Sequence, residues 1–110
     1  MSGRKARKQE RTHVSLEISL EGASGKRQAR VSDLSLGGCF IDSIFNMPSG
    51  EKLLLRIKIS DGEWLEIFGE VVYVFHGTGF GVRFTSISEK DKIVLEHLIL
   101  MHNGNPWGAD

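Results

Sequence analysis

Two short polar clusters contain the residue types in this chain that could bind a ligand. The first is an arginine pair, Arg7 and Arg11, set four residues apart in a basic N-terminal stretch. Each guanidinium offers a planar fork of N–H donors that matches a phosphate or the O6/N7 edge of guanine. The second cluster is Asp33–Gly38, where Asp33 can accept from the N–H edge of guanine and Ser35 can donate to phosphate. Together the clusters supply what a guanine-bearing anion requires.

The chain between the two clusters has the pattern of a β-hairpin. Residues 14–20 alternate apolar and polar, the period of a half-buried strand, and residues 22–25 carry a turn signal. A turn centred on residues 23 and 24 predicts that Leu16 faces Val31, Ile18 faces Ala29 and Val14 faces Asp33. The same register places Arg11 beside the loop that begins at Asp33, so we expect the two clusters to form one site.

Later alternating segments predict a small antiparallel β-barrel. The expected strands after the first hairpin are residues 39–41, 52–59, 64–75 and 80–84, with turns at 47–50, 60–63 and 76–79. The end of segment 64–75 is apolar on both faces, which predicts a strand that is covered on both sides. About six strands at this regular spacing favour a closed barrel, because closure removes exposed edges.

A helix is expected to follow the strands and to lie on the barrel. Ser88 and Asp91 approximate an N-terminal capping box. The expected apolar stripe consists of Val94, Leu95, Leu98 and Met101. Gly104 and Pro106 are expected to end the helix, which leaves residues 103–110 as a tail.

Composition limits the class of protein. A chain of 110 residues fits one domain, and its net charge of zero argues against a general binder of polyanions. Residues 1–11 nevertheless hold five basic side chains and one glutamate, a local charge of +4, so we expect a flexible basic arm before a domain over residues 12–102. The single Cys39 cannot form an internal disulfide, and no apolar leader or membrane-length run is present, which favours a cytoplasmic location.

The paired motifs resemble those of the PilZ domain, a bacterial family that binds cyclic di-GMP. They are R-x-x-x-R before the first strand and D-x-S-x-x-G after the second. The similarity extends over roughly residues 4–102 and includes Gly79–Phe84, which looks like the late glycine-containing strand of that domain. The resemblance implies a mainly β fold, a six-stranded antiparallel barrel with a C-terminal α-helix packed on it.

The resemblance also implies roles for individual residues. Arg7 and Arg11 would grip guanine and phosphate, Asp33 and Ser35 would complete the polar contacts, and Gly38 would permit close approach of the ligand. Possible accessory residues are Arg4, Lys8 and Tyr73, the last in the region where many family members place a stacking residue. Asp33 and Ser35 also have a purely structural interpretation, as turn residues that bond their own backbone.

We therefore expect a non-enzymatic cyclic di-GMP receptor, a monomer or weak homodimer with no cofactor, whose arm changes position on binding and signals to a separate effector protein. No metal site is expected, because His97 and His102 lack the spacing of zinc-binding pairs on a helix. Cys39, with His13 as a base, is better explained as a buried strand residue than as a nucleophile. Two alternatives are a PilZ-like adaptor that binds protein and no nucleotide, and a small barrel that binds single-stranded nucleic acid.

Overall fold

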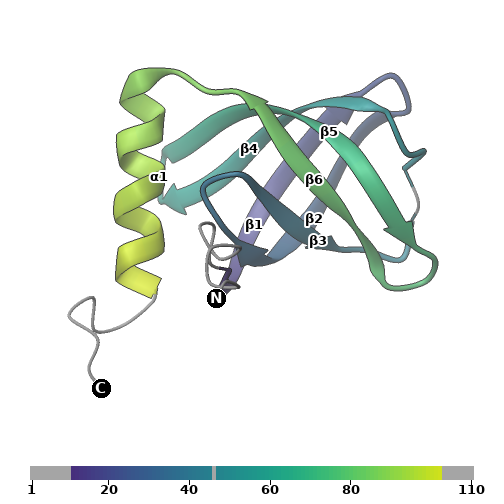
Figure 1. Cartoon of the computed structure of the whole chain (residues 1–110), viewed down its shortest axis with the longest axis horizontal. Helices are drawn as coiled ribbons and strands as arrows, with labels where there is room; N and C mark the ends of the chain where they lie inside the picture. The colour runs from purple at the N-terminus through teal and green to yellow at the C-terminus, as the bar shows by residue number, and fades with distance from the viewer. Residues whose placement is uncertain (1–10, 46, 103–110) are drawn as a thin grey trace, which may run out of the picture.

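The computed structural model describes residues 11–45 and 47–102, which form a β-barrel with a helix across one end (Figure 1). The elements are β1 (Thr12–Gly22), β2 (Gly25–Leu34), β3 (Gly38–Asp42), β4 (Lys52–Ser60), β5 (Glu63–Phe75), β6 (Gly79–Ser86) and α1 (Glu89–His102). Neighbouring strands are antiparallel, and the order β1-β2-β3-β6-β5-β4 returns to β1 and closes the barrel. The predicted six-stranded barrel with a C-terminal helix is confirmed.

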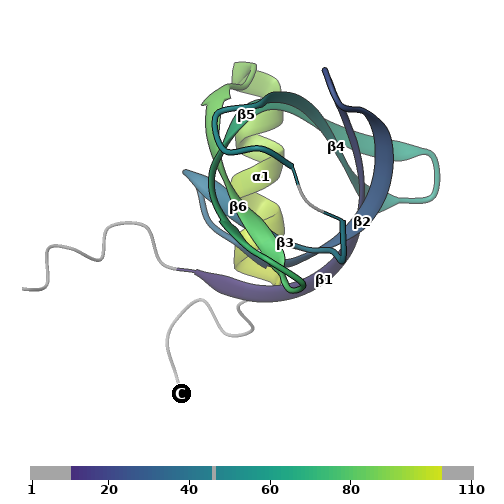
Figure 2. The ribbon, with the colours of Figure 1, turned by 90° about the vertical axis from the view of Figure 1, so that its right-hand side faces the viewer.

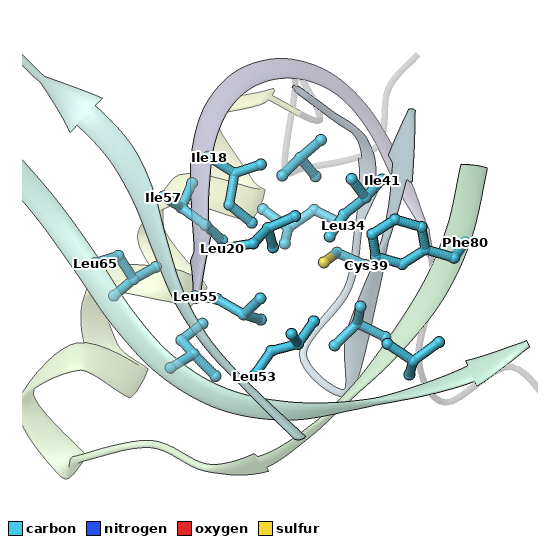
Figure 3. Packing of buried hydrophobic residues seen from close by; sticks show 14 of the residues in the cluster. Ile18, Leu20, Leu34, Cys39, Ile41, Leu53, Leu55, Ile57, Leu65 and Phe80 are labelled. Carbon is cyan, nitrogen blue, oxygen red and sulfur yellow. The ribbon is translucent and has the colours of Figure 1, made fainter. Parts of the chain in front are cut away.

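Apolar side chains fill the interior of the barrel (Figure 3). Strand β4 shows how the sequence directs them there, because Leu53, Leu55 and Ile57 are buried whereas the intervening Arg56 is exposed. Each fully buried leucine or isoleucine contributes roughly 1.5–3 kcal/mol to stability. The wall is therefore held from inside, and its outer surface is available for polar groups.

The first hairpin contains a β-bulge that the sequence alternation does not reveal. The turn lies at residues 23–24 as predicted, and two of the three expected pairs, Leu16 with Val31 and Ile18 with Ala29, are present. The third expected pair is wrong, because Asp33 faces His13 instead of Val14. Between these pairs Val14 and Ser15 of β1 oppose a single residue of β2. Such a bulge increases the local twist and re-aims nearby side chains.

The prediction that the end of β5 is covered on both sides is wrong. Val72, Tyr73 and Phe75 are 41%, 38% and 56% exposed. The register shifts between Val71 and Tyr73, which leaves Val72 as an extra residue and turns Tyr73 to the outer face opposite Gly81. Apolar residues at this end of the strand therefore point outward as well as inward.

The exposed rings of Tyr73 and Phe75 pack with the half-buried ring of Phe40, and the three form an aromatic surface. The ring centroids of Tyr73 and Phe75 are 5.3 Å apart, and Phe40 lies 6.2 and 6.1 Å from them. A methyl group on Gly81 would collide with the Tyr73 ring at 2.3 Å, so the missing side chain provides the space for that ring. The aromatic surface covers part of the outer wall of β3, β6 and β5.

Helix α1 stands across one end of the barrel, behind the ring of strands in Figure 2, and packs on β1 and β5. Its start is as predicted, since the backbone N–H of Asp91 donates to Ser88 Oγ at 3.1 Å. Leu95 and Leu98 are buried, but Met101 is 73% exposed and does not belong to the packing stripe. Ile99, four residues after Leu95, extends the stripe instead. No helix in the described part of the chain has the length and apolar character needed to cross a membrane.

Candidate functional site

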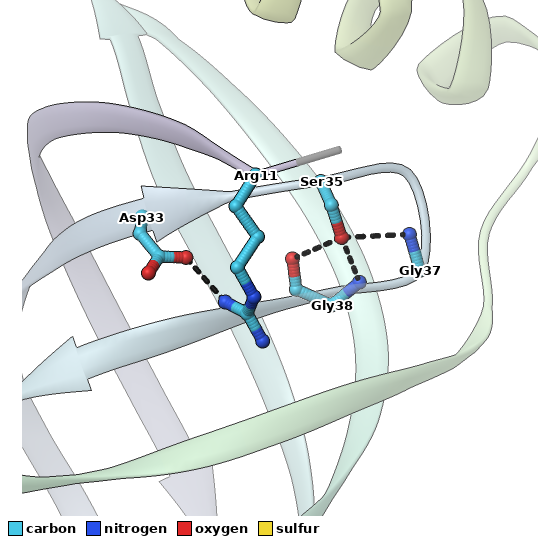
Figure 4. A network of polar contacts seen from close by, with 5 residues as sticks. All are labelled: Arg11, Asp33, Ser35, Gly37 and Gly38. Atoms are coloured by element: carbon cyan, nitrogen blue, oxygen red, sulfur yellow. Dashed lines mark hydrogen bonds and ion pairs between the residues drawn. The ribbon is translucent and has the colours of Figure 1, made fainter. Parts of the chain in front are cut away.

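Arg11 and Asp33 form an ion pair at the corner where β1 begins and β2 ends (Figure 4). The Nη1 group of Arg11 donates to Oδ1 of Asp33 across 22 positions of sequence. The hairpin brings the two residues together, because Arg11 directly precedes β1 and Asp33 is the penultimate residue of β2. The predicted proximity of Arg11 to this corner is confirmed.

Neighbouring groups keep the Arg11 guanidinium in its charged form. Partial burial lowers the pKa of Arg11, but hydrogen bonding and charge from Asp33, followed by Tyr73, outweigh burial and raise that pKa above its usual value. The Arg11 side chain is 48% exposed and that of Asp33 is 22% exposed. The corner therefore presents a fixed cation and a carboxylate side by side, both within reach of solvent.

Ser35 holds the shape of the loop between β2 and β3. Its hydroxyl oxygen accepts from the backbone N–H groups of Gly37 and Gly38, both at 3.2 Å, and its proton is donated to the carbonyl of Gly38 at 3.2 Å (Figure 4). Ser35 is buried, and a hydroxyl has only one proton to donate. The structural interpretation thus applies to Ser35, whereas the Asp33 carboxylate bonds the side chain of Arg11.

Gly38 is required by the neighbouring strand. A methyl group at this position would lie 2.3 Å from the carbonyl oxygen of Val82, a contact that real side chains do not make. The loop is also fastened to β6 by a 2.8 Å hydrogen bond from the Phe84 N–H to the Gly37 carbonyl. Gly38 therefore permits close approach of the β6 backbone. The close approach of a ligand that the family resemblance implies for this residue stays a prediction.

A shallow depression of about 140 Å³ lies beside this loop. It is lined by Arg11, by Ser35 and Gly37 of the loop, by Gly38 and Cys39 at the start of β3, and by Val72, Tyr73, Val82 and Arg83. Tyr73 therefore lies at the corner, and its accessory role in ligand binding stays a prediction. Arg83 was missed by sequence reasoning. The apolar alternation of Phe80, Val82 and Phe84 indicated that it faces outward, but nothing in the sequence indicated that β6 pairs with β3.

The other predicted residues fall into two groups. Arg4, Arg7 and Lys8 lie outside the residues that the structure describes. Cys39 is buried, and burial, with a smaller effect from Asp33 that Arg11 opposes, raises its pKa to about 12. A thiol in that state is a poor nucleophile. Over residues 11–45 and 47–102, no three His, Cys, Asp or Glu side chains are grouped to hold a metal ion.

These features define a small β-barrel domain with a charged corner on its outer wall. The sequence matches the model of the PilZ domain over residues 5–101. The chain belongs to the PilZ family.

Solved structures share this fold at low sequence identity. The inhibitor of motility MotI/DgrA of Bacillus subtilis is 18% identical, with a TM-score of 0.74, over 86% of this chain and 49% of that one. The PilZ domain of YcgR from Escherichia coli, solved with c-di-GMP, is 15% identical, with a TM-score of 0.71, over 87% and 90%. PlzA of Borreliella burgdorferi, in complex with c-di-GMP, is 16% identical, with a TM-score of 0.67, over 88% and 42%.

The present chain thus spans about half the length of MotI/DgrA and less than half that of PlzA. Curated proteins gave no match to the sequence.

Proposed function

We propose that this protein is a non-enzymatic receptor that binds cyclic di-GMP at the corner formed by Arg11 and Asp33. The observation that carries the proposal is the ion pair itself, which holds a cationic fork and a carboxylate side by side on a rigid barrel wall. Family membership supports the choice of ligand, as do the solved PilZ domain of YcgR and PlzA, both of which contain c-di-GMP.

Each group at the corner matches one part of the dinucleotide. The two phosphates carry two negative charges, and the fork of Arg11 can bind a phosphate or the O6/N7 edge of guanine. The Asp33 carboxylate accepts hydrogen bonds from the N–H edge of guanine through an oxygen that Arg11 leaves free or releases. Tyr73, which lies against the same depression, supplies a ring for stacking. Ser35 and Gly38 keep the loop in the shape that the ligand meets.

Signalling follows from the basic arm in this proposal. Arg7 is four residues before Arg11 and joins the bound dinucleotide, so that residues 1–11 take a new position on the barrel. The local charge of +4 on these residues favours association with a dianion and makes binding weaken with salt. A separate effector protein then reads the altered surface. The effector, a cytoplasmic location and the oligomeric state stay predictions.

Calorimetric titration of the full chain with cyclic di-GMP, with GTP as a control ligand, tests this function. Arg11→Ala should weaken binding by about 1.5–3 kcal/mol, the range for hydrogen bonds to charged groups. Arg56→Ala is a matched control, because Arg56 also forms an exposed strand-to-strand ion pair, with Glu66 at 2.9 Å, but lies on β4 outside the depression. Wild-type affinity in Arg11→Ala would remove the corner from the binding site.

The exposed aromatic surface favours a second candidate, an adaptor that binds a protein without nucleotide. Exposed apolar patches often mark docking sites for proteins, and Phe75 is 56% exposed at the edge of this one. An adaptor of this kind would give neither heat nor amide NMR shifts with cyclic di-GMP. Shifts confined to the Arg11 corner would decide for the receptor.

A further inference from the structure

We propose that Arg83 is a second cationic contact for a phosphate of the ligand, and that Glu70 limits the affinity of the site by competing for Arg83. This inference deepens the proposed function and rests on it. Neither residue belongs to the two motifs that the sequence presents before β1 and after β2.

Arg83 lines the depression from strand β6. It lies on β6, paired with Gly38 of β3 on one side and with Glu70 of β5 on the other. Its neighbour Val82 is buried, whereas the Arg83 side chain is 58% exposed on the outer wall. Among the residues that the structure describes, Arg11 and Arg83 are the two cations that line the depression. An anion seated there has both guanidinium groups in the lining of the depression.

The position of Arg83 relative to the loop is fixed by backbone contacts. Gly38 has no side chain to stand between Arg83 and the loop, and the close approach of the Val82 carbonyl leaves no space for one. The hydrogen bond from the Phe84 N–H to the Gly37 carbonyl holds the next residue of β6 in place. A cation presented on a preformed strand loses little freedom when a ligand binds, which favours affinity.

The present partner of Arg83 is easily exchanged. Its Nη2 group donates to Oε1 of Glu70 at 3.1 Å, and this is an exposed surface ion pair, a kind that adds little stability. A phosphate can accept two parallel hydrogen bonds from the guanidinium, whereas Glu70 accepts one in this structure. Glu70 then remains as a negative charge near a negative ligand. The same geometry therefore makes Arg83 favourable and Glu70 unfavourable for binding.

Calorimetry with cyclic di-GMP on the full chain separates these two effects. Arg83→Ala should weaken binding about 10- to 100-fold, the loss of a charged hydrogen-bonding partner. Glu70→Gln should tighten binding about threefold, because the substitution removes a negative charge near the ligand and keeps the shape of the side chain. Arg56→Ala is the control for loss of an arginine elsewhere on the wall and should leave binding unchanged.

The double variant Arg83→Ala/Glu70→Gln distinguishes direct contact from simple neutralisation of Glu70. If Arg83 touches the ligand, the double variant binds more weakly than Glu70→Gln alone. If Arg83 only neutralises Glu70, the double variant equals Glu70→Gln, and the inference is overturned. Circular dichroism checks folding, and Arg83→Gln, which keeps most of the side-chain stem, replaces Arg83→Ala if the alanine variant does not fold.

The outcomes also separate this inference from the proposed function. If the wild-type chain does not bind cyclic di-GMP, the proposed function is refuted and the inference with it. If the wild type binds and Arg11→Ala is weakened, but Arg83→Ala keeps wild-type affinity, the inference alone is refuted and the receptor function stands.

Discussion

Replacing Gly38 with alanine should destabilise the barrel in the absence of any ligand. The added Cβ would lie 2.3 Å from the Val82 carbonyl oxygen, whereas ordinary contact begins at 3.4 Å, so β3 and β6 must separate by about 1 Å. The obstacle is backbone and cannot rotate away. Overpacking of this kind costs about 1–3 kcal/mol, and weakening of the neighbouring Phe84–Gly37 hydrogen bond adds roughly 0.5–1.5 kcal/mol. We expect a loss of about 2–4 kcal/mol, a large part of the stability of a small domain.

Urea unfolding followed by circular dichroism measures this loss. With a slope of about 2 kcal/mol per molar urea, the midpoint of Gly38→Ala should fall by about 1–2 M. Gly62→Ala is the control, because its Cβ would meet nothing within 4 Å and only its φ of +81° opposes the change. That left-handed conformation alone costs about 1 kcal/mol. If Gly38→Ala loses no more unfolding free energy than Gly62→Ala, the structural role of Gly38 is refuted, and a role in ligand binding is favoured instead.

Two further predictions concern buried groups at the same corner. Ser35→Ala should lose roughly 2 kcal/mol of unfolding free energy without ligand, because the N–H groups of Gly37 and Gly38 lose their acceptor; unchanged urea unfolding would contradict this. Cys39 should resist thiol reagents at pH 8 until the chain unfolds, and rapid labelling of the native protein would count against its burial. The pKa of the Cys39 thiol is about 12 in the folded protein and about 9 in the unfolded chain. The free energy of unfolding should therefore fall as pH rises through this window, and Cys39→Ala should lack this fall.

The first hairpin and the Arg11–Asp33 corner could be predicted, because the signals that define them lie close together in the sequence. The alternation of residues 14–20 and the turn at 23–24 set the direction and approximate register of β1 and β2. That register brings Arg11 to the loop that begins at Asp33, whereas the exact pairing near Asp33 depends on the bulge. Strand β4 was equally clear, because its buried face is uniformly leucine and isoleucine and its outer face carries charges.

The remaining features depend on contacts between distant segments. The bulges at Val14–Ser15 and Val72 shift which residue faces which without disturbing composition, so alternation could not locate them. The pairing of β3 with β6 is non-local, and it determines both the need for glycine at position 38 and the presence of Arg83 at the site. Met101 was misassigned because a helical stripe read from sequence does not say where the surface beneath it ends.

Closure of the barrel through β3 and β6 also sets the moment at which the depression can exist during protein synthesis. The Asp33 corner leaves the ribosome early, but the strand that supports its loop and supplies Arg83 is made last among the six. Pairings between segments so far apart in sequence form slowly compared with a local hairpin. A nascent chain that stops before β6 therefore offers at most the Arg11–Asp33 pair, and the complete binding surface appears only after β6 has emerged and docked.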